Sequence, residues 1–234
     1  TKAPKAVPSK SYFGSQSKPD ETTKETEESN QRAVLEAVSE QIIDQVFSAT
    51  VNLSAHSLAD FMRQLVLVST AEIAGETKKG ITGVASFTNG SIHGGEDGPS
   101  IFCLQKLVEV ADYNMDVRPR LVWTQIWEIL GDFFSRVGCH RNSMVSVFAI
   151  DSLKQLSSKF QEKPELSEFH FQRIFLRPFL SIHQNPDTRQ DIRELILECV
   201  AQIVDRKAHN LQSGWKIFFD IVMMSASNEN DTII

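Results

Sequence analysis

Residues 121–138 read LVWTQIWEILGDFFSRVG, and this stretch decides the fold class. Its apolar side chains recur every three or four residues, which is the period of one face of an α-helix. The face comprises Trp123, Ile126, Trp127, Leu130, Phe133, Phe134 and Val137. Pro119 precedes this face, and proline is favoured in the first turn of a helix. Gly138 marks the expected end of the helix. Tryptophan is usually largely buried, so a core position for Trp123 and Trp127 is favoured over an exposed partner-binding pair.

Similar apolar stripes predict further helices on both sides of this stretch. The predicted ranges are 29–47, 54–74, a helix that follows Pro99, 119–138, 143–160, 166–183 with a break at Pro178, 186–206 and 210–225. In the first, Val34, Val38, Ile42 and Val46 form the expected buried face. Ser57 and Asp60 have capping-box spacing in the second, and Gly75 is its expected stop.

Long helices joined by short loops favour an all-α, armadillo- or HEAT-like α-solenoid of about eight helices. A recurrence of roughly 40–47 residues, typical of such helix pairs, is approximately met between residues 148–160 and 195–204. The internal sequence repeat is weak, and a closed helical bundle is the alternative fold.

The chain divides by composition into a tail and a helical part. Residues 1–29 hold prolines among Lys, Ser, Thr and Glu, which predicts a disordered linker. Residues 30–234 form the predicted helical-repeat regulatory domain, with a flexible loop at 75–100 where seven of the 11 glycines lie. Residues 231–234 read as the opening turn of a ninth helix, so we expect a fragment truncated within a longer protein.

Charge and cysteine content narrow the class of partner. The chain carries a net charge of −6, yet residues 118–216 hold 14 Lys/Arg against 11 Asp/Glu. A surplus of that size is too small to indicate nucleic acid, but it is compatible with an acidic protein face or an anionic membrane. Three separated cysteines among apolar residues suit a reducing, cytoplasmic compartment.

No motif of catalysis, cofactor binding or metal binding stands out. The six histidines lack zinc-site spacing, and Cys139–His140 has no second pair. Gly75 to Gly80 have the spacing of a phosphate-binding loop, but Ile81 stands where its lysine should be. We therefore expect a binding surface, with no catalytic residues, no cofactor and no metal.

Six residues are the candidates for partner binding. Trp215 follows a Ser-Gly turn at a helix start, a position that suits either partial exposure or burial. Basic residues near the same helix ends could gather at one edge of a solenoid, or could instead offset the carbonyls at a helix end. The candidate set is Trp215, Lys216, Arg206, Lys207, Arg118 and Arg120.

A series of short motifs resembles one known family. In order these are FCLQKLVEV at 102–110, YNM at 113–115, Trp123, IWE at 126–128, LGDFF at 130–134, FAIDSLKQLS at 148–157, KF at 159–160, FQ at 171–172, FLRPF at 175–179 and SGWK at 213–216. The series is similar to the region downstream of the catalytic domain in the large brefeldin-A-inhibited guanine-nucleotide exchange factors for ARF GTPases. The likeness covers roughly 31–234. It departs at 116–120, DVRPR, which is one residue longer than is usual in the family and contains Arg118 and Arg120.

The resemblance implies that the parent protein exchanges GDP for GTP on ARF through a separate domain. This chain would then be a non-catalytic regulatory part, which binds an activated small GTPase or another domain of the same protein. It further implies peripheral association with trans-Golgi or endosomal membranes, and allows the intact protein to be a homodimer. Two alternatives stay open, namely a purely structural spacer and a module that binds anionic membranes directly.

Overall fold

The computed structural model describes residues 26–27, 29–30, 32–33, 39–75, 99–162, 164–165 and 169–227. The chain divides into two compact units, Thr1–Glu40 and Gln41–Ile234, and the architecture below concerns the second. Most of the predicted linker at 1–29 and of the insertion at 75–100, and all of the predicted ninth helix at 231–234, lie outside the described residues. The domain boundaries therefore stay a prediction.

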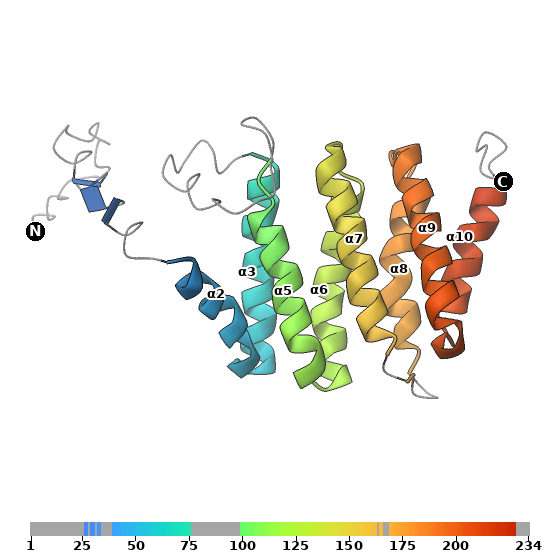
Figure 1. Ribbon diagram of the computed structural model, residues 1–234, viewed down its shortest axis with the longest axis horizontal. Helices are drawn as coiled ribbons and strands as arrows, with labels where there is room; N and C mark the ends of the chain where they lie inside the picture. Colours follow the sequence, from blue (N-terminus) through green and yellow to red (C-terminus); the bar gives the residue numbers. More distant parts are fainter. Residues whose placement is uncertain are drawn as a thin grey trace, which may run out of the picture. The chain divides into compact units, whose positions relative to one another are not determined.

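Every regular element in the described ranges is helical, as Figure 1 shows. From Glu40 onward, the α-helices of the described ranges are α2 (Glu40–Ser48), α3 (Ala55–Ile73), α5 (Phe102–Val117), α6 (Arg120–Gly138), α7 (Ser143–Phe160), α8 (Phe171–Gln184), α9 (Gln190–Lys207) and α10 (Trp215–Ser227). Two short 3-10 helices, η1 (Ala49–Asn52) and η3 (Ala208–Asn210), lie at connections.

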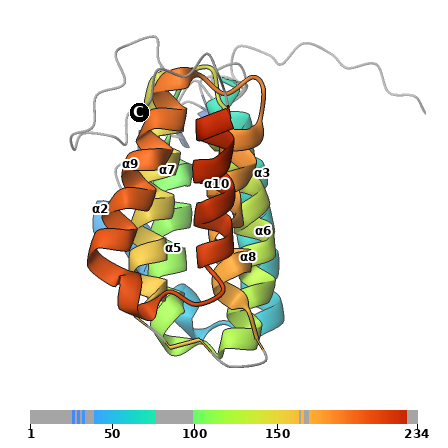
Figure 2. The same cartoon turned by 90° about the vertical axis from the view of Figure 1, so that its right-hand side faces the viewer.

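The helices pack in two layers, which are seen end-on in Figure 2. One layer holds α3, α6, α8 and α10 side by side, and the other holds α5, α7 and α9. From α3 onward, successive helices alternate between the two layers. Each pair of helices therefore packs on the next pair, as in a helical-repeat protein. The predicted all-α solenoid is confirmed.

Local sequence explains where several helices begin and end. The Ser54 side chain accepts a hydrogen bond from the Ser57 amide at the start of α3, and Asn142 does the same for Met144 at α7. Gly75 has φ +74 just after α3, a conformation that glycine adopts without strain. The predicted stop at Gly75 is thus confirmed.

Three local predictions are wrong. The cap of α3 is Ser54 rather than a box formed by Ser57 and Asp60. Pro178 does not break its segment but lies inside the continuous helix α8. Its ring packs against Gly131 of α6, where a Cβ would lie only 3.4 Å from the Pro178 Cγ.

The third error concerns the stripe predicted for the first helix. Ile42 and Val46 are 48% and 56% exposed, so they do not form a buried face in α2. The described partner of α2 lies on its other side, where Phe47 meets the rings of Phe61 and Phe102 edge-on. Val34 and Val38 lie outside the described residues.

The core is built around a stack of aromatic rings between α6, α7 and α8. Phe175 lies between Trp127, at a ring-centroid distance of 3.7 Å, and Phe160, at 4.2 Å. Phe171 meets Phe160 edge-on, and Trp123 lies 6.5 Å from Trp127. Both tryptophans are buried, which confirms their predicted place in the core.

One buried lysine reinforces the packing between two helices. Lys106 of α5 lies 2.7 Å from Asp44 of α2 and 2.8 Å from Glu109. Burial alone would lower the pKa of Lys106, but the hydrogen bonds to these two carboxylates raise it above its usual value. The lysine therefore stays charged and holds α2 against α5.

Two cysteines are predicted to be chemically inert in the folded protein. Burial, together with the Glu72 carboxylate, raises the pKa of Cys103 to about 12, and burial raises that of Cys199 to about 11. A raised pKa keeps a thiol protonated, so the reactive thiolate is roughly 10⁻⁴ and 10⁻³ of the population at pH 8. We expect a maleimide to label both residues slowly until urea unfolds the protein, as measured by mass spectrometry. Labelling of the native protein at the rate of free cysteine would contradict this.

Candidate functional site

All six candidate residues lie at one edge of the helical stack, the bottom of Figure 1. This lower edge contains the α5–α6 turn, the connection from α7 to α8 and the connection from α9 to α10. Its described connections are joined by side chains that reach from one to the next. The Asn210 side chain donates to the Gln161 carbonyl at 3.1 Å, and the Gln172 amide group donates to the Asn210 carbonyl at 2.8 Å.

Glu165 is the centre of this network. Its buried carboxylate accepts hydrogen bonds from the Gln172 amide at 3.0 Å, the Ser213 amide at 2.8 Å and the Ser213 hydroxyl at 2.6 Å. The first of these amides belongs to the opening turn of α8, where backbone N–H groups have no partner inside the helix. The carboxylate thus caps α8 and fixes the loop that leads into α10.

Gln172 extends the same contact. Its side-chain oxygen accepts from the Gln212 amide at 2.8 Å and from the Gly214 amide at 3.3 Å. The loop before Trp215 is therefore fixed by several hydrogen bonds that its backbone amides donate. The lower edge is a preorganised surface at this point.

Arg118 and Arg120 occupy the α5–α6 corner and contribute to its structure. The Arg118 guanidinium donates to the carbonyls of Thr50 and Val51 at 3.1 and 2.9 Å, and to the Asn114 side chain at 3.0 Å. It therefore holds η1 against the end of α5. The Arg120 guanidinium lies over the Phe171 ring at 5.4 Å, a cation–π contact between α6 and α8.

Arg206 and Lys207 lie at the last turn of α9. The Lys207 ammonium pairs with Glu162 at 3.3 Å, a surface ion pair of little energetic weight. The exposed Arg206 side chain makes no ion pair or hydrogen bond within the described ranges. It is the most available cation of the six.

Trp215 and Lys216 begin α10, the helix that follows α9 at the same edge. The half-buried Trp215 stacks on Phe219 at 5.7 Å, and Lys216 pairs with Asp220 at 3.0 Å. Phe219 and Met223 are 59% and 66% exposed, so an apolar stripe continues along α10 from Trp215. We call Arg206, Trp215, Lys216 and Phe219 the corner patch.

The exposed part of this stripe is not among the residues predicted for partner binding. Phe219 and Met223 lie on the face of α10 opposite the buried residues Ile217, Phe218 and Ile221. The available signal was that α10 is apolar around most of its circumference, which is unusual for a helix that has a solvated side. Such exposed patches mark interaction sites more often than chance.

Within the residues that can be described, no three His, Cys, Asp or Glu side chains gather where they could hold a metal ion. The same part of the chain has no helix long and apolar enough to cross a bilayer. The arrangement it does present is a preorganised edge with an aromatic and cationic corner. This edge belongs to a stack of helices of the helical-repeat type.

Comparison with known proteins identifies the family. Residues 159–234 match the family model Sec7-like HDS, described as Mon2/Sec7/BIG1-like, HDS. Brefeldin A-inhibited guanine nucleotide-exchange protein 1 of Homo sapiens is 39% identical over 192 residues, which are 82% of this chain and 9% of that protein. The chain therefore belongs to the family of brefeldin A-inhibited guanine nucleotide-exchange proteins, as its motifs indicated, and its residues 159–234 correspond to the HDS region.

Relatives in plants and yeast show the same coverage. Brefeldin A-inhibited guanine nucleotide-exchange protein 4 of Arabidopsis thaliana is 38% identical over 82% of this chain and 10% of its own length. The ADP-ribosylation factor guanine nucleotide-exchange factor sec71 of Schizosaccharomyces pombe is 36% identical over 89% of this chain and 11% of its own length. The chain thus spans about a tenth of the curated relatives it matches.

Proposed function

We propose that this chain is a regulatory segment of an exchange factor for ARF GTPases. It binds a small GTPase in its GTP form, or another domain of the same parent protein, and so controls membrane recruitment or autoinhibition. The factor would act from the cytoplasm, as a peripheral protein on trans-Golgi and endosomal membranes. The observation that supports this most is family membership combined with an edge that offers binding groups. The exchange reaction itself is assigned to another part of the parent protein.

The corner patch is the surface we assign to this binding. Trp215 and Phe219 provide a stacked aromatic pair, a residue type enriched in interface hot spots. Arg206 adds a cation that no described group neutralises, and the bonds to Gln172 hold the loop before Trp215 in place. A preorganised surface loses less conformational entropy on binding.

A pull-down tests the GTPase version. The full chain is incubated with ARF locked in its GTP or GDP form, and binding to the GTP form is expected to be the stronger. Arg206→Glu combined with Phe219→Ala should weaken capture about tenfold or more, because both positions are exposed and their loss removes a hot-spot ring and a charge. Arg141→Glu, an equal charge change at the opposite edge, is the matched control. Equal or absent binding of both nucleotide states would reject the GTPase version.

A direct membrane role is the second candidate. The exposed stripe of Phe219, Val222 and Met223 beside Lys216 has the amphipathic character of interfacial segments. Flotation with anionic vesicles would then show binding that weakens as salt is added. If the full chain neither floats nor captures ARF, the purely structural spacer becomes the preferred function.

A further inference from the structure

One exposed serine at the upper edge of the stack in Figure 1 faces a cation. Ser143 is the first residue of α7, and its hydroxyl oxygen accepts a hydrogen bond from the Arg189 guanidinium at 2.9 Å. Arg189 directly precedes α9, so this contact joins the α6–α7 connection to the α8–α9 connection. No other exposed serine in the described ranges receives a hydrogen bond from a Lys or Arg side chain.

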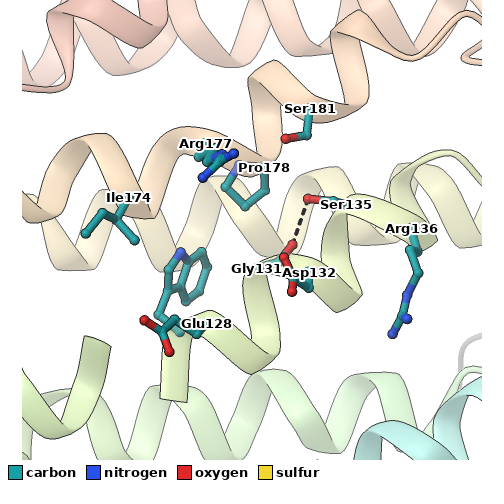
Figure 3. A pocket seen from close by; sticks show the side chains of 10 residues that line it. Glu128, Gly131, Asp132, Ser135, Arg136, Ile174, Arg177, Pro178 and Ser181 are labelled. Carbon is teal, nitrogen blue, oxygen red and sulfur yellow. Dashed lines mark hydrogen bonds between the residues drawn. The ribbon is translucent and has the colours of Figure 1, made fainter. Parts of the chain in front are cut away.

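Other serine hydroxyls are used inside their own helix. At the pocket between α6 and α8, the Ser135 hydroxyl donates to the Gly131 carbonyl at 2.7 Å, as Figure 3 shows. The exposed Ser48 and Ser227 donate to backbone carbonyls in the same way. The Ser143 hydroxyl only accepts, and its hydrogen has no acceptor among the residues that the structure describes. This hydroxyl is therefore available for reaction.

An acidic neighbour positions the Arg189 guanidinium. Its Nε and Nη2 donate to the Asp191 carboxylate, and its Nη1 donates to the Arg141 carbonyl at 3.1 Å. With the bond to Ser143, these contacts occupy four N–H groups, whereas a guanidinium carries five. Asp191 holds one edge of the planar group. The end formed by Nη1 and Nη2 can therefore receive the oxygens of a larger anion at Ser143.

The sequence before this serine carries basic residues. Arg141 stands two residues before Ser143, and His140 stands three residues before it. Arg141 is exposed, and its side chain makes no ion pair or hydrogen bond with the part of the chain that is described. Protein kinases select substrates by charge patterns of this kind, and one class of kinases requires a basic residue shortly before the serine. The hydroxyl and its recognition signal are thus presented together.

We propose that Ser143 is a phosphorylation site for a kinase of this arginine-directed class. The Ser143 oxygen forms a bond to the γ-phosphorus of ATP, the bond from that phosphorus to the bridging oxygen breaks, and ADP leaves. The hydroxyl proton passes to the catalytic base of the kinase. This site lies at the edge opposite the corner patch and goes beyond the function proposed above.

Arg189 is the partner that the phosphate meets. Asn142 already occupies the Met144 and Val145 amides at the start of α7, so the phosphate does not depend on them. A phosphate carries a charge of about −1.5 to −2 and accepts charge-assisted hydrogen bonds, which are about twice as strong as neutral ones. The contact between Ser143 and Arg189 is thereby strengthened. Because α7 and α9 pack on each other, phosphorylation fixes the starts of two neighbouring helices.

Phosphorylation of the full chain in vitro tests whether the site is used. The chain is incubated with ATP and the catalytic fragment of protein kinase C, which accepts an arginine two residues before the serine, and phosphopeptides are mapped by mass spectrometry. We expect phosphate on Ser143 and none on Ser54, which is also exposed but has no Lys or Arg shortly before it. Arg141→Gln should lower the rate at Ser143 about tenfold. Absence of phosphate from Ser143 in the native chain would overturn the proposal.

The melting temperature then tests the role of Arg189. Phosphorylation should raise the Tm of the native chain by about 2–4 °C, and that of Arg189→Gln by less than about 1 °C, because an amide supplies no charge. Each variant is compared with its own unmodified form, so destabilisation by the substitution itself cancels. Ser143→Ala treated with kinase and ATP is the control for phosphate elsewhere in the chain, and its Tm should stay unchanged. An equal rise in Arg189→Gln, or a fall in the native chain, would reject the assigned contact.

Discussion

Replacing Phe175 by alanine is expected to lower the free energy of unfolding by about 3–5 kcal/mol. The side chain is 2% exposed and lies between the rings of Trp127 and Phe160, at centroid distances of 3.7 and 4.2 Å. Its removal leaves a cavity at the junction of α6, α7 and α8, and both stacked pairs are lost. Urea denaturation followed by circular dichroism measures the change.

Phe219→Ala is the matched control, because it makes the same chemical change in α10. Phe219 is 59% exposed, so its loss should change the free energy of unfolding by no more than about 0.5 kcal/mol. Phe175→Leu should fall between the two, since leucine fills part of the cavity. Similar losses from Phe175→Ala and Phe219→Ala would show that the aromatic stack is not the centre of the core.

The stack also shows how much of the fold the sequence predicts. Apolar periodicity over 121–138 places Trp123, Trp127 and Phe134 on one face, and all three are buried. Periodicity depends only on neighbours within a few turns, so it identifies each helix and its inner face. The order of the helices, with short connections, then favours a two-layer stack.

Errors arise where a distant residue decides the outcome. Pro178 reads as a helix break because proline lacks an N–H, but α8 continues through it, and its ring packs against Gly131 of α6. Likewise Ile42 and Val46 follow a helical stripe, yet no described element covers them. Local pattern cannot supply these facts, because the partner is determined by tertiary packing.

The site was predictable only in part. Helix ends can be located from sequence, so the gathering of Arg206, Lys207, Trp215 and Lys216 near one corner follows from the two-layer arrangement. The role of Glu165 could not be predicted from the sequence. Its partner Ser213 is 48 residues away, and an isolated glutamate in a loop has no distinguishing neighbours. Whether the corner residues bind a partner stays a prediction.

Glu165→Ala is expected to lower the free energy of unfolding by about 2–4 kcal/mol, since it leaves amides of α8 and of the α9–α10 loop without their charged acceptor. Three donors, the Gln172 and Ser213 amides and the Ser213 hydroxyl, converge on this carboxylate. Urea denaturation gives the magnitude. Glu162→Ala is the control, because its exposed ion pair with Lys207 should be worth less than about 1 kcal/mol.

Hydrogen exchange distinguishes a local effect of this substitution from a global one. In Glu165→Ala the amides of Gln172 and Ser213 should exchange faster than those at the opposite edge, such as Met144, which Asn142 caps. The loop before Trp215 would then be less ordered, and any partner of the corner patch should bind more weakly although every patch residue is retained. Unchanged protection at Gln172 and Ser213 would mean that Glu165 does not organise the lower edge.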